Sequence, residues 1–276
     1  MRLQVEDAFA RLQVEACVEI TAPGAITAAI VGRSADFDVV VIGGGDGSVG
    51  AAAAALAGSE TPLGILPLGT FNHFAKDLGL PTDLAGAAKV IAQAKIRAVD
   101  VGEINGHVFV NAASLGIYPY LAAARGHHPW GRHRGLARIW ALLSTLARLL
   151  WRLPRPRLRL VLPEVDGWRK TPCLFIGNNL YALDPFASAW RSRLDGGELG
   201  IYLVNSERRF TLLSLVCRAA LGRLDPGLDL TLIRAEAVTI RAKRRIRVAL
   251  DGETLKLRAP LHCRIRPHAL RVLVKQ

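Results

Sequence analysis

The 276-residue sequence lacks the features that mark secreted, disulfide-bonded or membrane-spanning proteins. No window reaches the roughly 18 uncharged apolar residues that a membrane span needs. The first apolar stretch contains acidic residues, which a signal peptide does not. The four cysteines (Cys17, Cys173, Cys217 and Cys263) form no C-x-x-C pair, so we expect four buried thiols in a reducing cytosol rather than disulfides or a zinc site. These absences predict a cytoplasmic protein.

Common phosphate-binding and nucleic-acid-binding signatures are also missing. The run Gly43-Gly44-Gly45 does not open a G-x-G-x-x-G dinucleotide fingerprint, because Ser48 stands three residues after Gly45. There is no G-K-[ST] phosphate loop. There is also no paired Cys/His finger spacing, no aromatic-rich sheet motif and no heptad-linked basic helix, so we expect no nucleic-acid partner.

Charge is abundant but unevenly placed. The formal net charge is +13, and hydrophobic residues make up 51% of the chain, enough for a large buried core. Residues 1–120 contain seven Lys/Arg against twelve Asp/Glu, a net of −5, whereas the remainder contains twenty-nine against eleven, a net of +18. This split predicts that the two halves face different partners; anionic lipid, phosphates and nucleic acid all suit the basic half, and charge alone does not choose among them.

The first half of the chain alternates strands and helices. Phe37–Ile42 is typical of a strand buried on both faces of a parallel sheet, and a glycine turn and a helix follow it. Strand, glycine turn, helix and strand form the βαβ unit of an open α/β sheet, whose ligands bind at the carboxyl ends of the strands. Further helices are predicted at Leu3–Leu12, Ala25–Gly32, Val49–Ala57, Asn72–Leu78 and Leu84–Ala94, and further strands at Val14–Ile20 and Leu63–Leu66.

After Val99 the pattern predicts a mostly antiparallel β domain. Short alternating runs are separated there by Gly, Pro and Asn, and one strongly helical stretch, Arg134–Leu153, interrupts them. The expected strands are His107–Ala112, Arg157–Leu162, Cys173–Gly177, Leu199–Val204, Ala237–Ile240, Ile246–Leu250 and His262–Ile265.

The segment Val39–Ser48, with the sequence VVVIGGGDGS, carries the strongest chemical signal. Consecutive glycines let several backbone N–H groups point at one phosphate, at the start of a helix whose dipole favours negative charge. A carboxylate among them repels phosphate, so Asp46 makes sense as a ligand of Mg²⁺ or of a water on Mg²⁺. A tight strand-to-helix turn without a ligand is the alternative.

A second segment, Leu66–Lys76 with the sequence LPLGTFNHFAK, completes a family pattern. Together the two segments resemble the G-G-D-G-T and L-P-x-G-T-x-N-D-F-A motifs of the diacylglycerol kinase catalytic-domain family, which includes bacterial lipid kinases and the sphingosine and ceramide kinases. The resemblance continues, in the family's order, through Asp100-Val101-Gly102, Asn111–Gly116, Leu194–Leu199 and Asp251-Gly252-Glu253. It covers nearly the whole chain.

The resemblance implies a kinase that transfers the γ-phosphate of ATP, with Mg²⁺, to the hydroxyl of diacylglycerol or a similar long-chain lipid. Its fold would be an α/β domain like those of NAD kinases and 6-phosphofructokinases, at residues 1–98, followed by a β-sandwich lipid-substrate domain at 99–276. ATP phosphates and nucleotide would contact Gly43, Gly44, Gly45, Gly47, Ser48, Gly69, Thr70 and Asn72. Metal ligands would be Asp46, Asp100 and Asp195, and catalytic residues Asp46, Asp251 and Glu253, with Asp251 or Glu253 as general base.

The chain departs from the family pattern at several places. Ser48 replaces a threonine and keeps the hydroxyl, whereas His73 replaces an aspartate of the metal network and adds no negative charge. Of the acids in a second metal loop only Asp195 remains, with Gly196 and Gly200 at the other two positions, so we expect that site to be weak or absent. The family's first strand, which ends in N-P-x-S-G, is expected to be missing.

The helix predicted at 134–153 is basic on one face and rich in leucine elsewhere, with Trp140 and Trp151 beside the apolar arc. This pattern suits a helix lying in a membrane interface, although a helix packed on the β domain is the alternative. We expect peripheral attachment to anionic phospholipid, and a homodimer is compatible with the sequence. An NAD kinase-like enzyme acting on a soluble substrate and a non-catalytic nucleotide- or lipid-binding relative remain the alternatives to a lipid kinase.

Overall fold

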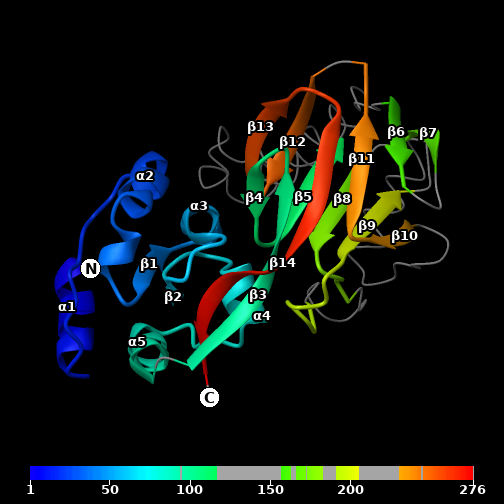
Figure 1. Ribbon diagram of the computed structural model, residues 1–276. Coiled ribbons are helices and arrows are strands. Elements are labelled where there is room, and N and C mark those ends of the chain that lie inside the picture. Colours follow the sequence, from blue (N-terminus) through cyan, green and yellow to red (C-terminus); the bar gives the residue numbers. More distant parts are fainter. Residues whose placement is uncertain are drawn as a thin grey trace, which may run out of the picture.

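The computed structural model describes residues 1–93, 95–116, 157–162, 166–171, 173–182, 191–204, 230–243 and 245–275. Figure 1 shows that the chain forms two units side by side, an α/β unit from the first part of the chain and a β-sandwich from the rest. Strands β3 (Lys95–Ile104) and β14 (Leu261–Val274) run from one unit to the other. The basic helix predicted at 134–153 lies outside the described residues.

The α/β unit is built on two parallel strands. Strand β1 (Val40–Gly44) pairs with β2 (Leu63–Pro67), so that Val40 lies opposite Leu63 and Gly44 opposite Pro67. Around them lie α1 (Arg2–Ala10), α2 (Ile26–Val31), α3 (Asp46–Leu56), α4 (His73–Asp77), α5 (Leu84–Gln93) and the single 3₁₀ turns η1 (Pro23–Ala25) and η2 (Ser34–Asp36). The predicted strand, glycine turn, helix and strand are confirmed.

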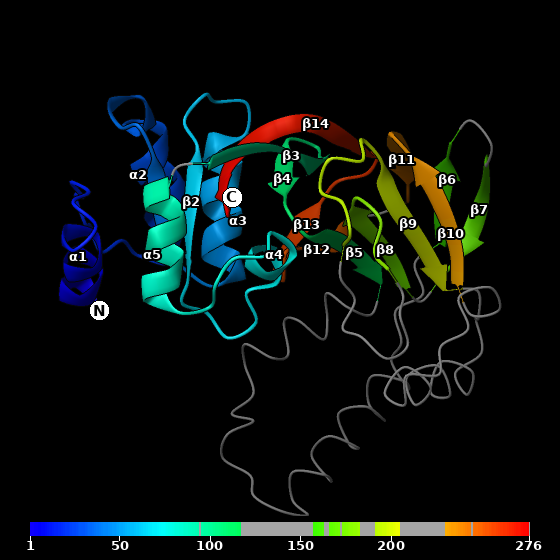
Figure 2. The same cartoon turned by 90° about the horizontal axis from the view of Figure 1, so that it is seen from below.

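Helices cover both faces of these strands, as Figure 2 shows. Val40 and Ile42 pack with the buried residues of α2 and α3, whereas Val39 and Val41 pack with those of α1 and α5. Successive side chains of a strand point to opposite faces, so a nearly continuous apolar run is what a strand covered on both sides requires. The glycine turn that follows β1 is thereby fixed at the carboxyl edge of the sheet.

The described strands form two sheets, one of which runs through both units, and the sandwich is built where the two sheets face each other. One has the order β1-β2-β14-β11-β6-β7, with β3 beside β14 and β4 beside β3, and the other has the order β10-β9-β8-β5-β12-β13. Their inward side chains share one apolar core. The remaining bounds are β4 (His107–Phe109), β5 (Ala112–Gly116), β6 (Arg157–Val161), β7 (Asp166–Lys170), β8 (Cys173–Asn178), β9 (Leu199–Val204), β10 (Leu230–Ala235), β11 (Ala237–Arg241), β12 (Ile246–Leu250) and β13 (Glu253–Leu257).

Strand β14 joins the two units. It pairs with β3 along most of its length, and near its end Val272 also lies parallel to Leu63 of β2. The β14–β3 register shifts between Arg266 and Leu270, which is where a bulge bends the strand. The predicted division between residues 98 and 99 falls inside β3 and stays a prediction.

Two sequence-based expectations are wrong. Residues 14–20 form no strand; they run along the surface, and only Val14 and Val18 pack against the α1–α5 core. Their alternating pattern predicted a strand, but no neighbouring strand pairs with them in the described sheets. Among the thiols, Cys263 is buried, Cys173 is half-buried and Cys17 is exposed; Cys217 lies outside the described residues.

Candidate functional site

Two glycine turns meet at the carboxyl ends of β1 and β2. A Cβ added at Gly69 would lie 2.3 Å from the Cα of Gly45, and one added at Gly45 would lie 3.3 Å from the Cα of Gly69. Only glycine at position 69 permits so close an approach between the two backbones, because a Cβ atom essentially never lies within 3.0 Å of a non-bonded atom from elsewhere in the chain. The predicted pair of motifs therefore forms one surface.

Asn72 holds the second turn closed. Its Oδ1 accepts a hydrogen bond from the N–H of Gly69 at 3.0 Å, and its Nδ2 donates to the carbonyls of Pro67 and Gly69 at 3.1 and 2.8 Å. The residue is buried and has a left-handed backbone with φ 52°, which asparagine tolerates better than most residues. Thus Asn72 shapes the turn, and the exposed Thr70 follows Gly69 on its outer side.

Asp46 is the first residue of α3 and lies between the two turns. Its Oδ1 accepts a long hydrogen bond of 3.5 Å from the N–H of Phe74 in α4. The residue is partly exposed, as are Gly47 and Ser48 after it. The free N–H groups of the first turn of α3 lie here, next to a carboxylate oxygen that no described donor occupies. Such a site can hold a phosphate and a Mg²⁺ ion that keeps most of its waters.

A turn from the sandwich reaches the same helix. Asp251 and Gly252 connect β12 to β13, and Glu253 begins β13. A Cβ added at Gly47 would lie 3.3 Å from Oε1 of Glu253, and one added at Gly50 would lie 3.2 Å from Oδ2 of Asp251. The structure therefore brings three predicted catalytic residues, Asp46, Asp251 and Glu253, to the start of one helix from two separate units.

Asp251 and Glu253 have different surroundings. The oxygens of Asp251 accept the N–H groups of Val110, Asn111 and Ala112 at 2.8, 2.8 and 3.0 Å. Burial raises the pKa of Asp251 to about 6, although these N–H groups and the charge of Arg191 act to lower it. Glu253, in contrast, is exposed. Asp251 is thus held as an anchor, whereas Glu253 is free to reach a bound molecule.

The three predicted metal ligands sit among different partners. Asp100 is fully buried, and its oxygens accept the N–H groups of His268 and Gly197 and the amide of Asn179. Asp195 pairs with Arg97 at 3.1 Å and Arg193 at 3.4 Å. Within the described part of the chain, no three His, Cys, Asp or Glu side chains lie close enough to hold an ion together.

The two arginines change the chemistry of Asp195. Partial burial acts to raise the pKa of Asp195, but hydrogen bonds and charge from Arg97 and Arg193 together lower it. Two guanidinium groups also repel an approaching cation. Of the three predicted ligands, only Asp46 keeps a partly exposed carboxylate without a charged partner among the described residues.

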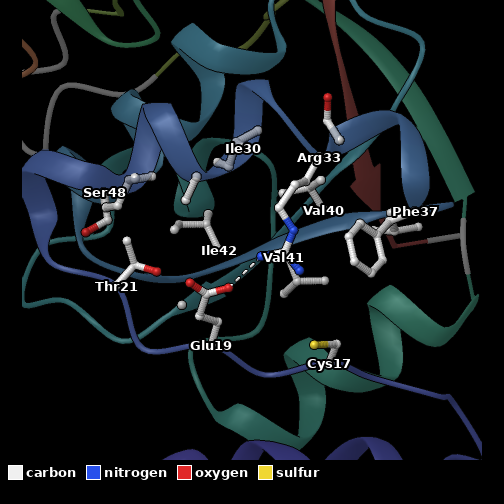
Figure 3. Close-up of a pocket in the computed structure, with 15 residues that line it drawn as sticks. Cys17, Glu19, Thr21, Ile30, Arg33, Phe37, Val40, Val41, Ile42 and Ser48 are labelled. Atoms are coloured by element: carbon white, nitrogen blue, oxygen red, sulfur yellow. Dashed lines mark hydrogen bonds and ion pairs between the residues drawn. The ribbon is translucent and has the colours of Figure 1, made fainter.

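A pocket of about 250 Å³ opens beside the glycine turn. Figure 3 shows that it extends from Ser48 at one end to Phe37 at the other, between α2 and the edge of β1. Residues 17–21 form its remaining wall, and the ion pair between Arg33 and Glu19, at 2.8 Å, spans it. Its Gly43 and Ser48 are predicted ligand-binding residues. Sequence reasoning missed the pocket, because its walls come from segments whose meeting no local pattern encodes.

Comparisons with known protein families agree with this geometry. The family model described as "Diacylglycerol kinase catalytic domain" matches residues 3–104, and the "YegS C-terminal NAD kinase beta sandwich-like domain" matches residues 157–274. A Pseudomonas aeruginosa protein named "Probable lipid kinase YegS-like" is 30% identical over 246 residues, which cover 87% of this chain and 77% of that protein. The chain belongs to the diacylglycerol kinase catalytic-domain family. It is therefore a phosphotransferase with an alcohol group as acceptor.

Two further relatives of this family are informative. A "Diacylglycerol kinase" of Bacillus subtilis is 37% identical over 84 residues, which cover 29% of this chain and 28% of that protein. A crystal structure of a diacylglycerol kinase from Bacillus anthracis str. Sterne has the same fold, with a TM-score of 0.69 at 19% identity over 97% of this chain and 88% of that one. The α/β unit followed by an antiparallel sandwich is thereby confirmed.

Proposed function

We propose that the protein transfers the γ-phosphate of ATP, with Mg²⁺, to the hydroxyl of diacylglycerol or a similar long-chain lipid. The observation that carries the proposal is the meeting of two glycine turns with the Asp251–Glu253 turn at the start of α3. One side offers backbone N–H groups to phosphate, and the other offers carboxylates to a hydroxyl. Phosphoryl transfer needs mainly this positioning, charge neutralisation and one group that accepts the hydroxyl proton.

The donor side is proposed to lie over the glycine turns. Gly43, Gly44, Gly45, Gly47 and Ser48 would contact the phosphates together with Gly69 and Thr70, while Asn72 keeps the second turn in shape. Asp46 would hold a Mg²⁺ ion, which would neutralise phosphate charge, because a single carboxylate with phosphates and waters satisfies that ion. The adjoining pocket would take the nucleoside, since its wall of Ile30, Val40 and Ile42 is apolar. We assign Asp100 to positioning and do not extend the metal role to Asp195.

The acceptor side is proposed to lie at the Asp251–Glu253 turn. We assign the general base to Glu253, because the oxygens of Asp251 are already engaged by three backbone N–H groups. Glu253 is exposed and lies close to Gly47, the residue after Asp46. A proton taken from the lipid hydroxyl would then pass to a carboxylate next to the transferred phosphate.

The lipid is proposed to reach this site from a membrane surface. Arg241, Lys243 and Arg245 are exposed around the β11–β12 connection, and each basic residue near anionic lipid contributes about 1 kcal/mol of attraction. No helix among the described residues is long and apolar enough to cross a membrane. We propose peripheral attachment through this connection and through the basic segment 134–153.

Metal dependence tests the site assignment. Activity measured as transfer from [γ-³²P]ATP to diacylglycerol in mixed micelles should vanish with EDTA and return with Mg²⁺. Asp46→Asn should raise the Mg²⁺ concentration for half-maximal rate and lower kcat. Asp36→Asn, an exposed acid in η2, serves as the matched control with parent behaviour. Metal-independent transfer, or an unchanged Mg²⁺ requirement in Asp46→Asn, would contradict the assignment.

A further inference from the structure

Arg191 is a buried arginine with a hydrogen bond on each of its three side-chain nitrogens. Its side chain is 0% exposed. Nε donates to Oδ2 of Asp77 at 2.8 Å, and Nη2 forms an ion pair with the same oxygen at 2.7 Å. Nη1 donates to the carbonyls of Val110 and Asn178 at 2.6 and 3.0 Å, and Nη2 also donates to Oδ1 of Asn111 at 2.9 Å. A guanidinium has five N–H groups, and Arg191 makes four side-chain hydrogen bonds in addition to its ion pair with Asp77.

The acceptors of Arg191 come from both units of the fold. Asp77 ends α4, the short helix whose Phe74 N–H contacts Asp46. The Arg191 guanidinium lies 5.8 Å from the ring of Phe74 and 5.2 Å from that of Tyr181. Asp77 and Phe74 thus belong to α4, next to the second glycine turn. The guanidinium connects α4 to the sandwich, where Val110 and Asn178 accept its other hydrogen bonds.

On the sandwich side, Arg191 binds the short segment that also holds Asp251. The carbonyl of Val110 and Oδ1 of Asn111 accept hydrogen bonds from Arg191. The backbone N–H groups of the same two residues donate to the carboxylate of Asp251. The segment is therefore fixed from both sides. A continuous chain of contacts links Asp46, α4, Arg191, Val110 and Asp251.

We propose that Arg191 is a positioning residue that sets the Asp251–Glu253 turn against Asp46 and so fixes the spacing between phosphoryl donor and acceptor. The inference rests on the proposed function and extends it. Arginine suits this task because its planar fork binds several acceptors in one fixed geometry, which a flexible lysine or an apolar side chain does not reproduce. A buried ion pair adds little net stability over apolar packing, so specificity of geometry is the better explanation of its presence.

Steady-state kinetics separate positioning from binding. Arg191→Met keeps a long side chain but removes the charge and every donor. A displacement of about 1 Å at the reacting groups costs about 10²-fold in rate, so we expect kcat to fall by that order while the KM for ATP and for lipid changes far less. Arg191→Lys should recover only part of kcat. Arg11→Met, which breaks an exposed ion pair with Asp7, is the control and should behave as the parent.

The pH dependence distinguishes this role from general support of the fold. The charge of Arg191 lowers the pKa of Asp251, which burial raises to about 6; Asp77 and Tyr181 are the other titratable groups next to Arg191. The three N–H groups that hold the turn bind ionised Asp251 best, so the rate should fall at the pH where Asp251 takes up a proton. Arg191→Met should therefore move this acidic limb of the pH–rate profile to higher pH. Asp77→Asn leaves the arginine charge unneutralised and should move it to lower pH. Equal losses at every pH in both variants would overturn the proposal.

A measurement that needs no activity keeps the inference separate from the proposed function. If the parent transfers no phosphate to any lipid, the proposed function fails, whereas amide hydrogen exchange still tests the contact chain. In Arg191→Met the amides of Val110, Asn111 and Ala112 should exchange faster than in the parent, while those of the β6–β7 pairs, at the edge of the other sheet, do not change. Unchanged exchange at 110–112 would contradict the role of Arg191, whatever the kinase assay gives.

Discussion

Replacing Gly69 by alanine tests the contact between the two glycine turns. The added Cβ would lie 2.3 Å from the Cα of Gly45, 3.0 Å from its N and 2.8 Å from Oδ1 of Asn72. Carbon atoms in favourable contact are about 3.5–4.0 Å apart, so the turns must separate by more than about 1 Å. Backbone atoms oppose the new methyl on the Gly45 side, and no flexible side chain there can move aside to relieve the contact.

Two consequences of Gly69→Ala have different sizes. Overpacking of this kind costs about 1–3 kcal/mol of unfolding free energy, which a protein of ordinary stability survives. Misplacing phosphate-binding N–H groups by about 1 Å costs about 10²-fold in rate. We therefore expect a folded protein with a modestly lowered melting temperature, weaker ATP binding and a kcat lower by two orders of magnitude.

The assay compares this variant with Gly32→Ala. Gly32 follows α2, has φ −81°, and has nothing within 4 Å of an added Cβ, so the substitution should leave stability and activity as in the parent. Calorimetric ATP titration and thermal unfolding on both variants separate the binding defect from the stability defect. Parent-like ATP affinity and turnover in Gly69→Ala would refute the reasoning that the two turns form one phosphate-binding surface.

Three further predictions concern the other parts of the site. Glu253→Gln should lower kcat by about 10²–10⁴-fold without changing ATP affinity or melting temperature, since Glu253 is exposed; undiminished turnover would exclude it as the base. Ala29→Trp should fill the pocket beside Ser48 and raise the Kd for ATP while leaving the KM for lipid unchanged. Because the folded-state pKa of Asp251 is about 6, above its ordinary 3.8, its neutral form stabilises the fold at low pH. That contribution is lost as pH rises from about 4 to 6, up to about 3 kcal/mol; urea unfolding of Asp251→Asn should lack this fall, and an identical pH profile would disprove it.

The α/β unit was the part most open to prediction from sequence. The apolar run that ends in glycines and the alanine-rich helix after it are local patterns, and β1, α3 and β2 follow within a few residues of their predicted bounds. The error at residues 14–20 has a physical cause. Alternation identifies a segment able to pair, but pairing needs a neighbouring edge, which no local pattern reports.

The sandwich was predicted less completely: β7, β10 and β13 were not predicted, and the long strands β3 and β14 were missed wholly or in part. Only His262–Ile265 was predicted of β14, because Arg266, Pro267 and His268 interrupt its alternation where the structure has a bulge. Strand β3 was not predicted for a similar reason, because the charged residues Arg97, Asp100 and Glu103 interrupt its apolar pattern. Those charges are satisfied by distant partners, such as the N–H of His268 for Asp100, that sequence spacing does not reveal.

The candidate site, too, could be predicted only in part from the sequence. Family motifs led to Asp46, Asp251 and Glu253, and the structure brings all three to the start of α3. They gave no sign of Arg191, whose acceptors come from α4, from Val110 and Asn111, and from Asn178. A residue that acts by joining distant segments leaves no local signature.

The most direct test of the central claim is transfer of the labelled γ-phosphate from MgATP to diacylglycerol in mixed micelles, with NAD as a parallel acceptor. The proposed lipid kinase should produce labelled lipid, lose that product in Glu253→Gln, and leave NAD unlabelled. Label in NAD alone would identify an enzyme that acts on a soluble substrate. ATP binding without label in either acceptor would mean that the glycine turns bind a nucleotide and that the Asp251–Glu253 turn does not catalyse phosphate transfer.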